Sequence, residues 1–145
     1  MENRILISFL FLLLNMSCQK KENNNSNNEP LIAVIKLNSA EEIKNFKEAL
    51  NYLDVDKVYS KYSKPVGMTP EEYWKEVVNA SYQFSRDKKF TNVFKYYDYN
   101  IITKKRNENE CLISFIPHKK GSKSIIYTLN LKNGKWKIVN IDYTP

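Results

Sequence analysis

The apolar residues from residue 90 onward constrain the fold most, because they recur at every second position. Three segments each keep one parity: Val93, Tyr97, Tyr99 and Ile101; then Cys111, Ile113 and Phe115; then Ile125, Tyr127, Leu129 and Leu131. A period of two is typical of a β-strand that buries one face and exposes the other. The sequence therefore predicts three long strands in this part of the chain.

Turn signals separate these strands and introduce a fourth. Residues 107–109 predict the first turn, and residues 117–121, which run from a Pro to a Gly, close the second strand. Asn133-Gly134 is a strong short-range signal for a β-hairpin, because both residues tolerate positive φ. Short turns between successive strands predict an antiparallel meander of four strands.

The fourth strand changes parity along its length. Trp136 and Ile138 share one parity, whereas Val139, Ile141 and Tyr143 lie on the other. A strand keeps one face buried across such a change only if an extra residue is inserted. We therefore expect a β-bulge near Ile138 or Val139.

Helical signals fill the chain before residue 90. Residues 31–37 form a short apolar run that fits either an edge strand or the lead-in to a helix. Ser39 with Glu42 three positions later has the pattern of a capping box, which predicts a helix start. The apolar face expected of this helix is Ile43, Phe46, Leu50 and Leu53.

Two further helices are expected. A short one starts near Asp54 or Asp56, and its apolar residues are Val58, Tyr59 and Tyr62. A longer one starts at Thr69 and Pro70, since Thr suits the N-cap and Pro the first helical position. Its apolar stripe is Tyr73, Trp74, Val77, Val78, Ser81 and Phe84. Helices followed by a meander predict an α+β fold, with N-terminal helices packed on a curved four-stranded antiparallel sheet.

The N-terminus carries an apolar run that ends next to Cys18. Residues 5–14 are almost entirely Ile, Leu, Phe and Ser, which is too short for a bilayer span of about 20 residues. Ser17 and Cys18 follow, and this arrangement resembles the lipobox of bacterial lipoproteins. The resemblance implies removal of residues 1–17 and lipid attachment at Cys18. The alternative is an ordinary signal peptide cut nearby, with Cys18 as a free thiol.

The polar segment that follows predicts the domain organisation. Residues 18–30 are rich in Asn and lack apolar periodicity, so we expect a lipidated Cys and a flexible tether. Residues 31–145 then form a single domain. The expected location is the bacterial cell envelope, with a lipid anchor in the outer membrane that faces the periplasm or the surface.

The folded region also resembles a known superfamily. Residues 40–62, with the helix break at Tyr52-Leu53-Asp54-Val55-Asp56, and residues 129–138 are similar to the cone-shaped nuclear-transport-factor-two-like, or cystatin-like, fold. Within it, the chain is similar to small bacterial lipoproteins described as lumazine-binding. The resemblance implies a cone that often encloses a pocket, and some members are isomerases or dehydratases that use an acid–base residue in an apolar cavity.

Few residues are candidates for catalysis. The single His, His118, lies in an expected turn, and Asp98 has the parity opposite to the apolar face, so both are expected at the surface. Cys111 is expected to be buried and inert. No metal-ligand spacing, glycine-rich phosphate loop or nucleophile motif is present, and we expect no metal and no cofactor.

Aromatic residues at core periodicity are either core or the lining of a ligand pocket. The candidates for such a pocket are Tyr73, Trp74, Tyr97, Tyr99, Phe115, Tyr127 and Trp136. Sites of this kind are usually concave and apolar. The sequence leaves both readings open.

The net charge of +7 is spread over turns and strands. It fits a solvated surface, attraction to anionic lipid, or an acidic partner, and no nucleic-acid motif accompanies it. The expected function is a membrane-anchored, non-catalytic binding domain for a protein partner or a small apolar ligand. The alternatives are a small enzyme that uses the cone cavity and an immunity or inhibitor protein against an envelope-acting toxin.

Overall fold

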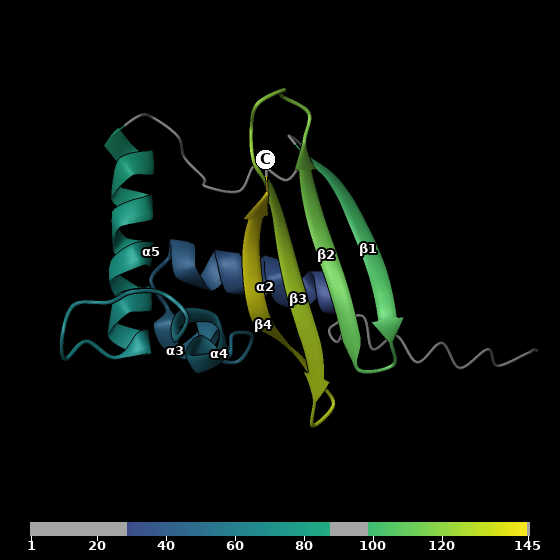
Figure 1. Cartoon of the computed structure of the whole chain (residues 1–145), viewed down its shortest axis with the longest axis horizontal. Helices are drawn as coiled ribbons and strands as arrows, with labels where there is room; N and C mark the ends of the chain where they lie inside the picture. The colour runs from purple at the N-terminus through teal and green to yellow at the C-terminus, as the bar shows by residue number, and fades with distance from the viewer. Residues whose placement is uncertain (1–28, 88–98, 145) are drawn as a thin grey trace, which may run out of the picture.

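The computed structural model describes residues 29–87 and 99–144, and it has an α+β architecture (Figure 1). The helices are α2 Pro30–Glu42, α3 Phe46–Ala49, α4 Val55–Tyr59 and α5 Pro70–Asp87. The strands are β1 Tyr99–Asn107, β2 Glu110–Pro117, β3 Ser124–Lys132 and β4 Lys135–Thr144. They form one antiparallel sheet in the order β1-β2-β3-β4. The predicted order of helices before a four-stranded meander is confirmed.

The alternating residues of the strands form the buried face of the sheet. Cys111, Ile113 and Phe115 on β2 are fully buried, and Leu129 on β3 lies opposite Cys111. The predicted hairpin between β3 and β4 is present, with positive φ at Asn133 and at the following Gly. The part of the first predicted strand that includes Val93 and Tyr97 lies outside the described residues.

The predicted bulge in β4 is also confirmed. Thr128 pairs with Asn140 and Leu129 pairs with Ile138, so Val139 has no partner on β3. The edge of β4 that faces away from β3 also forms hydrogen bonds at this point. The Ile138 backbone accepts one from residue 54 and donates one to residue 52. These bonds form a short parallel bridge at Leu53.

The helix α2 corrects two expectations about the N-terminal segment. It begins at Pro30 and continues through Ser39 to Glu42, so Ser39 does not start a helix and the predicted capping box is wrong. Residues 31–37 are helical, which rejects the edge-strand alternative. Residues 31–37 are apolar except for Lys36. A segment with a single polar residue does not show whether its apolar period is that of a helix or of a strand. The helix buries Ala33, Val34, Leu37 and Ala40 against the rest of the core.

The single helical face expected at residues 43–53 is likewise wrong. The chain reverses at Lys44, which has a φ of 57°, and Ile43 is 73% exposed. The later helix starts agree with prediction. Asp54 caps α4 by accepting the Lys57 N–H, and Thr69 accepts the Glu72 N–H at the start of α5.

The helices cover one face and one side of the sheet. In Figure 1, α2 crosses behind the strands, from behind β2 to the neighbourhood of α5. The helices α4 and α5 stand beside β4 and pack against each other. The space between α4, α5 and β4 is where the candidate site lies.

Candidate functional site

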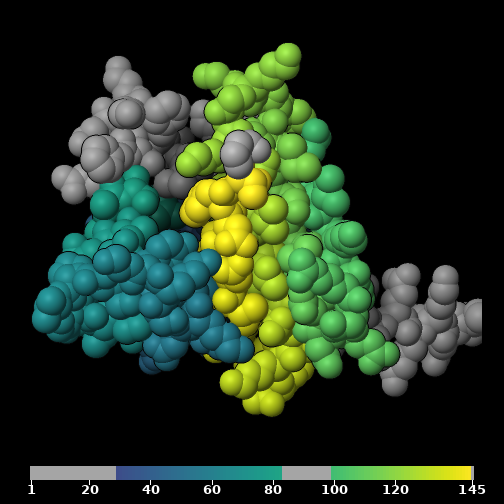
Figure 2. Space-filling view, in the orientation of Figure 1, coloured from purple at the N-terminus to yellow at the C-terminus, as the bar shows by residue number. Residues whose placement is uncertain are grey.

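A cavity of about 130 Å³ opens between α4, α5 and the C-terminal half of β4. Figure 2 shows the helical part of the chain packed along the edge formed by β4. The lining residues are four tyrosines and three aliphatic residues: Tyr59, Tyr62, Tyr73, Tyr143, Val58, Val77 and Ile141. An apolar wall with a few polar groups is typical of a small-molecule site.

Local structure brings these residues together. Tyr73 and Val77 are four positions apart on α5, so they lie on the same face of that helix. The bulge at Val139 switches the parity of β4, which turns Ile141 and Tyr143 toward the helices. The cavity therefore depends on one helix face and one strand irregularity.

Three of the tyrosine rings contact one another. The ring centroids of Tyr59 and Tyr62 are 5.7 Å apart, and each centroid lies 6.2 Å from that of Tyr73. The interplanar angles range from 32° to 67°, so the rings are inclined rather than stacked in parallel. They form an aromatic triangle, defined here as Tyr59, Tyr62 and Tyr73, in the wall of the cavity.

One carboxyl group is held close to this wall. The Nε1–H of Trp74 donates a hydrogen bond of 2.7 Å to Oε1 of Glu41, near the end of α2. Burial raises the pKa of Glu41 to about 7, and the bond from Trp74 opposes part of that shift. Glu41 is therefore a mixture of neutral and charged forms near neutral pH.

The charge of Glu41 acts on two tyrosines of the cavity. Burial raises the pKa of Tyr59, and the Glu41 carboxylate raises it further. Partial burial raises the pKa of Tyr143, although the residue is 60% exposed. The charges of Tyr62 and Glu41 raise this pKa further. Both hydroxyls therefore stay protonated, and Glu41, when it is ionised, is the negative charge that acts on them.

Among the cavity tyrosines, Tyr59 has a hydroxyl that reaches solvent. Tyr52 and Tyr82 donate their hydroxyl hydrogens to protein oxygens. No fully buried side-chain oxygen or nitrogen in the described ranges lacks a partner, and no hydrogen bond is found there for the Tyr59 hydroxyl. That hydroxyl is thus within reach of solvent even though Tyr59 is a buried residue.

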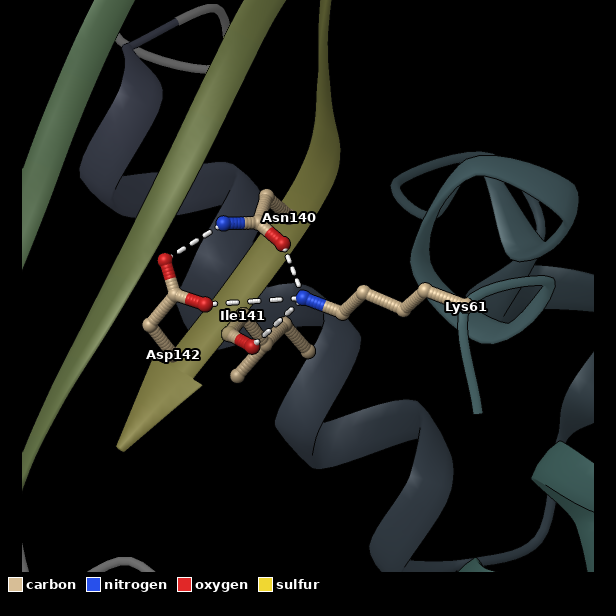
Figure 3. Close-up of polar contacts among 4 residues, drawn as sticks. All are labelled: Lys61, Asn140, Ile141 and Asp142. Carbon is tan, nitrogen blue, oxygen red and sulfur yellow. Dashed lines mark hydrogen bonds and ion pairs between the residues drawn. The ribbon is translucent and has the colours of Figure 1, made fainter. Parts of the chain in front are cut away.

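A lysine ties the wall of the cavity to the sheet (Figure 3). Lys61, just after α4, donates hydrogen bonds to the Asn140 side chain and to the Ile141 carbonyl, and it pairs with Asp142 at 3.5 Å. Asn140 in turn donates to Asp142. The Lys61 ammonium also lies 5.4 Å from the centroid of the Tyr62 ring. The contact holds α4 against β4.

The structure places the predicted pocket residues in different environments. Tyr73 lines the cavity, and Trp74 is the buried partner of Glu41. Phe115, Tyr127 and Trp136 are buried in the core. Tyr99, Phe115 and Tyr127 form a row of edge-to-face rings with centroids about 6 Å apart.

The other predicted residues lie apart from the cavity. His118 is exposed in the loop after β2, and Cys111 is fully buried, where burial raises the pKa of its thiol. Cys18, Tyr97 and Asp98 are outside the described residues. Within residues 29–87 and 99–144, no cluster of His, Cys, Asp or Glu is arranged to hold a metal ion.

Sequence reasoning missed Glu41 and the role of three tyrosines. Tyr59, Tyr62 and Tyr143 have core periodicity, which does not separate a cavity wall from a filled core. Glu41 is followed by a second glutamate, and its hydrogen-bond partner Trp74 lies 33 positions away, so no local pattern marks it. The only sequence signal was the high number of tyrosines, ten in all.

No family model, no curated protein and no solved structure matches this chain. In the part of the chain that the structure describes, no helix is long and apolar enough to cross a membrane.

Proposed function

We propose that this chain is a lipid-anchored protein of the bacterial cell envelope whose non-catalytic domain binds a small apolar ligand. The observation that carries the proposal is the tyrosine-lined cavity between α4, α5 and β4. Its volume of about 130 Å³ is close to the roughly 150 Å³ of an apolar cavity that accepts benzene. A single aromatic ring or a compact aliphatic group is thus the expected size of the ligand.

The proposed anchor supports an outward-facing site. The lipobox-like segment ends at Cys18, and the tether leads to Pro30 at the start of α2. Helix α2 has 13 residues and is therefore about 20 Å long. One end of α2 lies behind β2, and its other end lies near α5 (Figure 1). The ligand site thus lies toward the C-terminal end of α2.

We also propose membership of the cystatin-like superfamily with its cone-shaped fold. The helix α2 crosses the buried face of a four-stranded antiparallel meander, and the break at residues 52–56 pairs with β4. Both features are in line with the resemblance of the sequence. A fold alone does not determine a ligand, so the cavity remains the basis of the functional proposal.

The test is the binding of phenol to the full chain purified in detergent, followed by NMR of Ile141 and Tyr143. Phenol is expected to shift these resonances in the wild type. The Val77→Phe variant fills the cavity and should abolish the shifts, whereas Val66→Phe makes the same change at a fully exposed loop position and should keep them. Equal shifts in both variants, or none in the wild type, would reject the cavity as the site.

Acid–base catalysis is the second candidate function, and Glu41 is the observation that favours it. A carboxyl with a pKa of about 7 beside an apolar cavity suits a general acid or base. Cyclopentanone, a small ketone with exchangeable α-hydrogens, is the probe. Deuterium exchange that is faster than in buffer and lost in Glu41→Gln would support an enzyme. If exchange is no faster than in buffer, catalysis is rejected and ligand binding is the remaining function.

A further inference from the structure

The three rings of the aromatic triangle lie close enough together to contact one small group. Their centroids are 5.7–6.2 Å apart, so an atom over the centre of the triangle can lie within about 6 Å of all three rings. Within that distance the negative face of an aromatic ring attracts a cation. Tyr143 adds a fourth ring to the same cavity.

The residues that line the cavity carry no positive charge. None of the seven lining residues is basic, and the carboxyl that acts on Tyr59 and Tyr143 is Glu41. The nearby lysines are already engaged. Lys61 is paired with Asp142, and Lys64 donates to the carbonyls of residues 59, 60 and 62.

A cation–π contact between two residues of the protein is already present at the aromatic triangle. The Lys61 ammonium lies 5.4 Å from the centroid of Tyr62, so one ring of the triangle already has a cation over it. That ammonium also has three oxygen acceptors on β4. The hydrogen bonds of Lys61 are therefore made to these oxygens, and the Tyr62 ring adds a cation–π contact.

The residues that line the cavity favour one chemical class of cation. The wall consists of tyrosine rings and the side chains of Val58, Val77 and Ile141, with no carboxylate among them. A primary ammonium has three N–H donors to satisfy when it loses its hydration, and the only side-chain acceptors in the lining are the tyrosine hydroxyls. A methylated ammonium has no N–H to satisfy and presents a surface of methyl groups to the aliphatic wall. Its head group is comparable in size to benzene, which suits a cavity of about 130 Å³.

We propose that the cavity binds the trimethylammonium head of a small quaternary ammonium compound over the aromatic triangle, with Glu41 as the counter-charge. The proposal rests on the ligand-binding function proposed above and specifies its ligand class. The rings supply the attraction, the aliphatic residues supply the apolar contact, and the Glu41 carboxylate balances the charge of the ligand.

The test compares choline with 3,3-dimethylbutan-1-ol, its uncharged isostere, by NMR titration of the full chain in detergent. Choline should bind at least tenfold more tightly, because the two compounds differ only in charge. Tyr73→Phe keeps the ring and should keep this preference. Tyr73→Leu removes the ring and should reduce choline affinity at least fivefold, as should Glu41→Gln, which keeps an acceptor for Trp74. Circular dichroism checks that all variants are folded.

The outcomes separate the two proposals. Equal affinity for choline and the isostere would overturn the cation site and leave the small-ligand function standing. Phenol binding without choline binding would have the same meaning. Binding of none of the three compounds would reject both. Unchanged choline affinity in Tyr73→Leu and Glu41→Gln would overturn the aromatic triangle and its counter-charge as the site.

Discussion

At the scale of single residues, Glu41 is a position where burial changes ionisation in the neutral pH range. Its side chain accepts one hydrogen bond from Trp74, and its surroundings include Tyr59 on α4 and Tyr143 on β4. Burial disfavours the charged carboxylate, so the folded protein holds its proton to a higher pH than the unfolded chain. The consequence is a pH-dependent stability that is independent of any ligand.

The first prediction concerns that stability. The folded pKa of about 7 lies above the ordinary value of 4.5, so the folded state binds more protons between these values. The free energy of unfolding should therefore fall as pH rises from 4.5 to 7 and stay lower above pH 7. Between pH 4.5 and pH 7 the wild type should lose at most about 3 kcal/mol of unfolding free energy relative to Glu41→Gln. Partial exposure of the Glu41 side chain reduces this loss.

Urea denaturation of the wild type and Glu41→Gln at pH 5 and pH 8 measures this difference. Glu42→Gln is the matched control, since it removes a carboxyl from the same helix without touching Trp74. Its pH dependence should equal that of the wild type. A wild type whose stability relative to Glu41→Gln does not change with pH would contradict the assignment.

At the scale of elements, the bulge of β4 connects the sheet to the cavity. Before Val139, Trp136 and Ile138 face the core, and after it Ile141 lies on the same side in spite of the change of parity. The bulge also allows Ile138 to hold the segment at Leu53 on the outer edge of the strand. One inserted residue thus positions both the cavity wall and the approach to α4.

The second prediction is the effect of deleting Val139. Without Val139, the residues Ile138, Ile141 and Tyr143 share one parity in a regular strand, so Ile141 and Tyr143 keep the face that they have now. Phenol binding should therefore be retained.

Deletion of Thr128, in the regular part of β3, instead puts Tyr127 and Leu129 on opposite faces and should cost about 2 kcal/mol or more of unfolding free energy. Thermal unfolding and the NMR titration measure the two effects. Loss of phenol binding after deletion of Val139 would show that the bulge itself shapes the cavity.

At the scale of the whole molecule, the proposed tether would join the domain at the start of α2, and the cavity lies toward the other end of that helix. A lipid at Cys18 followed by a polar tether would hold the domain near the bilayer without inserting it. Several acyl chains anchor a protein stably, because each buried CH₂ contributes about 0.8 kcal/mol. The domain itself buries its apolar residues in a single core between the helices and the sheet.

The third prediction tests the anchor. Cys18→Ala should move the protein from the membrane fraction to the soluble fraction of a bacterial host, and the labelling of the chain by a palmitate analogue should disappear. Cys111→Ala is the matched control, because Cys111 is buried in β2 and should leave fractionation unchanged. Cys18→Ala protein that still carries label and stays in the membrane fraction would refute lipidation at this residue.

Local patterns were sufficient to predict most of the elements. The period of two predicted the strands, Asn133-Gly134 the hairpin, and the parity change the bulge, because each depends on residues close together in the chain. The starts of α4 and α5 were predicted for the same reason, since a cap bonds within three positions. The first helix was misjudged where apolar residues run without interruption and no period can be read.

The candidate site was decided by tertiary structure. Lys61 reaches Asn140 across 79 positions, and Glu41 reaches Trp74 across 33. Neither contact has a local pattern, because it exists only once α2, α4 and α5 are packed beside β4. The sequence by itself determined which residues are apolar and how each element begins and turns. Packing alone decided which tyrosines enclose a cavity and which carboxyl is buried beside it, because burial depends on neighbours that are distant along the chain.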